Sequence, residues 1–114
     1  MRREKLYLAD IVEAAKAIRS FIEGVTFEKF MDSDVVKSAV LMKLIVIGEA
    51  ASKLPQGVKE KYPDIPWRKI TDFRNYVVHA YFSVDWVLVW SAATVEAPAL
   101  QDKVERILKA EFPS

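Results

Sequence analysis

The sequence carries one histidine, and the residues around it could do acid–base chemistry on a phosphate. His79 is the only histidine of the 114 residues, and Arg74 stands five positions before it. An imidazole titrates near neutral pH and can act as a general acid or base. An arginine stays charged and presents a planar fork of donors that matches phosphate oxygens. Together the two groups suit phosphodiester cleavage by the 2′-hydroxyl of RNA, in which His79 moves a proton and Arg74 stabilises charge at phosphorus.

The spacing of the two residues leaves two arrangements open. On an unbroken helix, five residues correspond to about 500° of rotation, so the side chains would point about 140° apart. Either the helix loosens near Val78, because valines are poor helix formers, or the functional unit combines groups from two subunits. Spacing alone also allows both residues to be structural. Arg74 would then pair with Asp72 or another carboxylate.

Helical periodicity dominates the elements that must position these groups. Apolar residues at steps of three and four begin at Leu8 and predict an amphipathic helix that ends near Gly24. The later helices are expected at about 34–54, 67–77 and 84–97, with single helical turns within 25–31 and at 59–62, and a last segment after a kink or restart at Pro98. The sequence therefore predicts an all-α, antiparallel bundle of four to five helices in a single domain, residues 1–114.

Composition excludes several classes of function. With no cysteine, the chain has no disulfide, thiolate nucleophile or cysteine-based zinc site, and one histidine excludes a multi-histidine metal cluster in a single chain. We therefore expect neither a metal nor a cofactor. The net charge of +1 argues against a general polyanion binder but permits a local phosphate site. The apolar stretches are shorter than the roughly 20 residues that span a bilayer, so no membrane segment and a cytoplasmic location are expected.

Two of the expected helices lack a generous polar face. The helices at 34–54 and 84–97 are apolar over most of their circumference. A bundle of this length hides one such helix more easily than two. The sequence therefore predicts a homodimer with two-fold symmetry, and the alternative is a well-buried monomer.

The segment around the histidine resembles a known motif. Arg74, Asn75, His79, Ala80 and Tyr81 are similar to the Arg-x4-His-x-Tyr motif of the HepT family, within the HEPN superfamily of helical ribonucleases. Further segments look alike in the same order across nearly the whole chain: Tyr7–Ile11, Ile47–Ala51, Leu54–Pro55, Tyr62–Trp67 and Tyr81–Asp85.

The resemblance implies a function. HepT-like proteins are toxins of toxin–antitoxin pairs that form HEPN-like helical homodimers, with the two Arg-His motifs facing across the interface. They cleave RNA without a metal, and tRNA is a substrate class of the family. Their antitoxin is a minimal nucleotidyltransferase that silences the toxin by AMP transfer (adenylylation) to the motif tyrosine. The resemblance thus assigns catalysis to Arg74 and His79, support to Asn75 and modification to Tyr81.

The chain departs from the family pattern at two places. Ala80 stands where the family commonly has aspartate, and we expect catalysis to survive this change at a variable position. Met42, Lys43 and Val46 stand where many relatives carry polar residues, a change that bears on substrate choice or activity. A non-catalytic helical module that binds nucleotides or a nucleotidyltransferase partner is therefore the alternative function. A purely structural dimer would require a buried, dry motif.

Other residues near the motif have more than one interpretation. Asn75 either orients the site or caps the end of its helix, and Tyr81 could instead be a core aromatic. Trp86 and Trp90 lie at helical spacing and are expected in the core or a dimer interface. Glu49 could support the site, but a solvated or helix-paired glutamate is the more common case.

Overall fold

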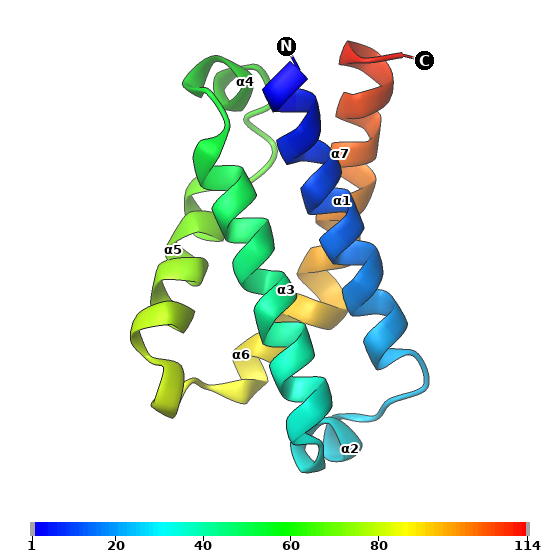
Figure 1. Ribbon diagram of the computed structural model, residues 1–114, viewed down its shortest axis with the longest axis vertical. Helices are drawn as coiled ribbons and strands as arrows, with labels where there is room; N and C mark the ends of the chain where they lie inside the picture. The colour runs from blue at the N-terminus through cyan, green and yellow to red at the C-terminus, as the bar shows by residue number, and fades with distance from the viewer. Residues whose placement is uncertain (1, 114) are drawn as a thin grey trace.

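The computed structural model describes residues 2–113, and these residues form helices joined by short connections, with no strand among them (Figure 1). The predicted all-α fold is confirmed. The helical elements in chain order are α1 (Arg2–Ile22), α2 (Phe27–Asp32), α3 (Asp34–Lys53), α4 (Gln56–Lys61), α5 (Trp67–His79), the 3₁₀ turn η1 (Tyr81–Ser83), α6 (Trp86–Ser91), the π-helical segment η2 (Ala92–Glu96) and α7 (Ala97–Glu111).

Helix α3 is the centre of the arrangement. It packs against α1 on one side and against α5 on the other, and α1 packs in turn against α7. In Figure 1, α1, α3 and α7 run side by side, and α5 lies at the outer edge beside α3. The helix that carries Arg74 and His79 is therefore held mainly by α3.

Helix α1 buries the apolar residues that its periodicity places along one face. Leu8, Ile11 and Ile18 are fully buried, as the periodicity predicts. The helix is longer at its start than the stripe indicated, and it ends at Ile22. Gly24 then adopts φ +72°, a conformation in which a residue without Cβ avoids a clash with the following carbonyl.

Helix α3 begins and ends almost where the sequence predicted. The Ser33 hydroxyl accepts a hydrogen bond from the Val36 amide at 3.1 Å, which satisfies one of the unpaired N–H groups of the first turn. Its buried residues are Val40, Leu41, Leu44, Ile47, Gly48, Ala50 and Ala51. No helix within residues 2–113, this apolar one included, is long and apolar enough to cross a membrane.

The last three elements form one continuous helical path, so of the kink or restart expected at Pro98 the restart does not occur. Asp85 caps the start of α6 by accepting from the Val87 amide at 2.9 Å. Pro98 has no N–H, and in a regular α-helix its ring would crowd the carbonyl of Thr94. The wider π-helical turn η2 lies just before Pro98 and makes room for the ring, so the chain continues into α7 without a restart.

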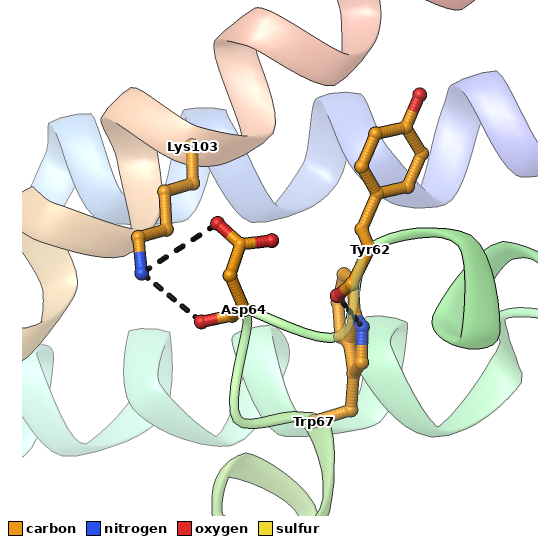
Figure 2. A network of polar contacts seen from close by, with 4 residues as sticks. All are labelled: Tyr62, Asp64, Trp67 and Lys103. Atoms are coloured by element: carbon orange, nitrogen blue, oxygen red, sulfur yellow. Dashed lines mark hydrogen bonds and ion pairs between the residues drawn. The ribbon is translucent and has the colours of Figure 1, made fainter.

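Hydrogen bonds hold the connector between α3 and α5 to the first residue of α5 and to α7. Its helical turn is α4, which begins three residues earlier than expected. The indole Nε1 of Trp67 donates to the Tyr62 carbonyl at 3.1 Å, and Lys103 Nζ donates to the Asp64 carbonyl at 3.0 Å (Figure 2). These contacts set where α5 begins relative to α7.

A polar cluster ties the connector to the end of α7. The Tyr62 hydroxyl donates to Glu111, and Lys61 Nζ lies 2.6 Å from Glu111 Oε2. The hydrogen bond from Lys61, and then that from Tyr62, lower the pKa of Glu111. The same contacts raise the pKa of Lys61 and of Tyr62, since each is hydrogen-bonded to the carboxylate.

Candidate active site

Arg74 lies on the inward side of α5. Trp67, Ile70, Arg74 and Val77 follow each other at steps of three and four, which places them along one face. Trp67 and Val77 are buried, and the Arg74 side chain is only 23% exposed. The arginine thus occupies a position of the apolar stripe that packs on α3.

The aliphatic stem of Arg74 packs directly on Gly48 of α3. A Cβ at Gly48 would lie 2.2 Å from Cβ and 2.7 Å from Cγ of Arg74, closer than any real pair of such atoms. Only glycine therefore allows α3 and α5 to approach this closely. A glycine inside an otherwise apolar helix is the sequence signal of such an approach.

The charged end of Arg74 meets Glu49, the next residue of α3. Arg74 Nη1 lies 3.0 Å from Glu49 Oε1, and the glutamate side chain is 45% exposed. Glu49 is therefore paired with another helix and not within its own, while its side chain remains partly exposed to solvent. Of the carboxylates that the structural alternative allowed, Arg74 pairs with Glu49 and not with Asp72, whose Oδ2 lies 4.0 Å from Arg68 Nε. Arg74 Nε is buried and has no hydrogen-bond partner among the described residues.

His79 is the last residue of α5 and is exposed. The helix remains regular to this point, since the Ala80 amide still donates to the Tyr76 carbonyl at 2.8 Å. The predicted loosening near Val78 was therefore wrong. With α5 unbroken, the Arg74 and His79 side chains of one subunit leave the helix about 140° apart and do not share a face.

Tyr81 lies in the 3₁₀ turn η1 and its side chain is 57% exposed. Its ring meets the ring of Phe82 edge-on, at 5.2 Å between centroids, and Phe82 is 98% exposed. The alternative of a core tyrosine was wrong. The turn is held against α5 because the Asp85 amide donates to the Tyr76 hydroxyl at 2.7 Å.

The remaining candidates divide between surface and core. Asn75 lies inside α5 and is exposed, so it does not cap the end of its helix. Trp86 and Trp90 pack around Phe30 of α2, with ring centroids 6.1 and 4.8 Å from it. Both tryptophans are half-buried and pack against the core, which agrees with the expectation of a core or interface position.

Comparison with known proteins decides the family. The family model described as "Ribonuclease HepT-like" matches residues 11–107. The chain belongs to the HepT-like ribonuclease family. The family assignment made from the Arg-x4-His-x-Tyr motif is thus confirmed.

Relatives of similar length support the HepT-like assignment. A Thermococcus cleftensis protein named "Probable ribonuclease HepT" is 37% identical over 108 residues, which cover 95% of this chain and 98% of that protein. A Methanocaldococcus jannaschii protein named "Putative RNase" is 38% identical over 105 residues, which cover 92% of this chain and 87% of the relative. Comparison with solved structures gave no significant match.

The four residues at which the HepT-like chain was expected to depart from the family pattern lie at the end of α5 and on α3. Ala80 follows His79 as the C-terminal cap of α5. On α3, Met42 is exposed, whereas Lys43 and Val46 are half-buried. Met42 of α3 is thus accessible to solvent.

A groove of the HepT-like chain lies apart from the three motif side chains. It has a volume of about 420 Å³ and lies between α5 and the path from α6 to α7, with Leu44, Ile47, Phe73 and Leu88 in its mostly apolar lining. None of the three motif side chains at Arg74, His79 and Tyr81 lines it. Within residues 2–113, no three or more His, Asp or Glu side chains cluster as metal ligands would.

Proposed function

We propose that this HepT-like chain is a metal-independent endoribonuclease that works as a homodimer. The observation that carries the proposal is the unbroken α5, which directs Arg74 and His79 of one subunit to different sides. A second copy then supplies the group that the first copy lacks. The exposed Val78 and Phe82 beside His79 support this arrangement, because exposed apolar side chains in one place are typical of interfaces.

The proposed reaction is cleavage by the RNA's own 2′-hydroxyl. The 2′-oxygen attacks phosphorus, the bond from phosphorus to the 5′-oxygen breaks, and the products are a 2′,3′-cyclic phosphate and a 5′-hydroxyl. One imidazole of His79 takes the proton from the 2′-hydroxyl, and an acid gives a proton to the leaving oxygen. Arg74 donates to the phosphate oxygens as charge develops on them.

Three arginine and histidine variants test the site. His79→Ala and Arg74→Ala are expected to abolish RNA cleavage, measured on purified protein with a chelator present, while the far-ultraviolet helical signal stays intact. Arg68→Ala is the matched control, because Arg68 lies on the same helix with its side chain 95% exposed. Full cleavage by both site variants would refute the assignment.

Mixing the two inactive variants tests the shared site. When Arg74→Ala and His79→Ala subunits exchange, half of the dimers are mixed, and each mixed dimer keeps one intact site, so roughly a quarter of wild-type cleavage should return. Light scattering is expected to give the mass of a dimer. No recovery in mixtures proven to contain mixed dimers would count against a site built from both subunits.

We also propose that the chain is the toxin of a toxin–antitoxin pair, silenced by adenylylation of Tyr81. The tyrosine oxygen attacks the α-phosphorus of ATP, pyrophosphate leaves and the phenolic proton is lost. The support is the exposure of Tyr81 and its place two residues after His79. A nucleotide there adds bulk and negative charge where an RNA phosphate would bind.

Co-expression tests the adenylylation. The protein produced with a nucleotidyltransferase encoded beside it is expected to gain one adenylyl group in its intact mass, located to Tyr81 by peptide mapping. Tyr81→Phe should gain none and should remain toxic to growth. An unmodified Tyr81 together with neutralised toxicity would refute this mode of control. Cleavage of purified tRNA, compared with messenger RNA, tests the substrate class.

A non-catalytic module that binds nucleotides or the nucleotidyltransferase is the second candidate. The observation that favours it is the ion pair between Arg74 and Glu49, which offsets the positive charge, together with the apolar Met42. Tight binding to the nucleotidyltransferase without cleavage of any RNA would favour this function over the first.

A further inference from the structure

We infer that Glu49 is a positioning residue, which holds the guanidinium of Arg74 in the orientation that meets the scissile phosphate. This inference rests on the proposed ribonuclease function. Glu49 contacts Arg74 and is not itself assigned a contact with RNA. Its role is to fix one end of a side chain whose other end Gly48 fixes.

The contacts restrain Arg74 along its whole length. At its base, Cβ and Cγ lie against the backbone of Gly48, so the first torsion of the side chain has little freedom. At its tip, Nη1 lies 3.0 Å from Glu49 Oε1, and this ion pair limits the positions that the guanidinium can take. A flexible arginine would lose conformational entropy each time it bound a phosphate, and a restrained one has already lost it.

The donors of the guanidinium show which edge is left for a phosphate. Arginine has five N–H groups in a fixed fork. In the described structure Nη1 meets Glu49, and Nε is buried without a partner. The Nη2 end therefore remains to donate to an incoming phosphate. The carboxylate fixes this choice, because without it the guanidinium can rotate about its stem.

Because Glu49 is negatively charged, its removal can distinguish a role in positioning Arg74 from a simple effect on the attraction between Arg74 and RNA. A carboxylate beside Arg74 weakens the pull of the arginine on any phosphate, so it does not serve affinity for RNA. If Glu49 positions Arg74, its removal lowers the rate of the chemical step although the net positive charge at the site increases. If Glu49 only masked the charge, its removal would strengthen binding and raise kcat/KM.

Kinetics of three variants test the inference. Glu49→Ala is expected to lower kcat by about 10- to 100-fold, with KM changed less than about threefold, because misplacing a catalytic group mainly affects the transition state. Glu49→Gln should recover part of kcat, since its amide oxygen can still accept from Nη1. Glu13→Ala is the matched control, because Glu13 is an exposed glutamate on α1.

A spectroscopic readout follows the arginine directly. The buried Arg74 Nε–H should give a slowly exchanging signal in a nitrogen-15 correlation spectrum of the wild-type protein. Glu49→Ala is expected to broaden or shift this signal, whereas Glu13→Ala should leave it unchanged. A signal that is the same in all three proteins would overturn the inference.

The outcomes distinguish this inference from the proposed function. If the wild-type protein cleaves RNA and Arg74→Ala does not, an undiminished kcat in Glu49→Ala overturns the positioning role alone. A higher kcat/KM in Glu49→Ala also overturns it, in favour of charge masking. A wild-type protein that cleaves no RNA overturns the ribonuclease proposal, and the positioning role falls with it.

Discussion

Replacing Gly48 by alanine tests the close packing of α5 on α3. The added Cβ would lie 2.2 Å from Arg74 Cβ. Because non-bonded carbon atoms prefer separations of about 3.5–4.0 Å, the two helices must move apart locally by more than about 1 Å. Arg74 Cβ is bonded to the backbone and cannot rotate away, so a change of rotamer does not relieve the contact.

Two opposing effects set the change in the free energy of unfolding that Gly48→Ala should cause. Alanine is better than glycine inside a helix by about 1 kcal/mol. Overpacking of a tight site costs about 1–3 kcal/mol, occasionally more, and a clash with a backbone-bonded atom belongs at the upper end. We therefore expect Gly48→Ala to lower the free energy of unfolding by about 2 kcal/mol, and the melting temperature by roughly 5–10 °C.

Gly57→Ala provides the matched control, because Gly57 is also helical but a Cβ there would have nothing within 4 Å. It should leave the stability unchanged or raise it by up to about 1 kcal/mol. Both variants are measured by thermal and urea unfolding, followed by circular dichroism at one protein concentration, because a dimer's stability depends on concentration. A Gly48→Ala protein at least as stable as the Gly57→Ala protein would refute the close approach of α3 and α5.

Two further predictions concern the core and the connector. Gln101 is buried on α7, and its Oε1 has no hydrogen-bond partner among the described residues. Gln101→Met should therefore raise the free energy of unfolding, measured with urea, by about 1 kcal/mol. A decrease of about 1 kcal/mol in that free energy would show that the amide is hydrogen-bonded. Because Lys61 and Tyr62 lower the pKa of Glu111 from its ordinary value of 4.5, their stabilisation is present above that pH and is lost as the pH falls through the folded-state pKa. Acid unfolding should therefore be less steep in Glu111→Gln than in wild type, and identical curves would contradict the coupling.

The helices could be predicted because their signals are local. The apolar stripe from Leu8, the cap at Ser33 and the position of Pro66 before Trp67 depend only on neighbours within a few residues. Arg74, His79 and Tyr81 were selected because they lie in one short segment that resembles a family motif, and their roles stay a prediction. The π-helical turn before Pro98 was missed because such a turn has no clear pattern in a single sequence.

The amino-acid sequence by itself determined an all-α chain, the approximate limits of its helices and its membership of a ribonuclease family. The tertiary structure decided which groups meet. Glu49 and Arg74 lie on different helices, and their contact depends on how α3 and α5 are rotated and spaced, which Gly48 sets. The regular end of α5 likewise separates Arg74 from His79 within one subunit. Periodicity assigns a residue to a face of its own helix, but the packing of one helix on another selects its partner.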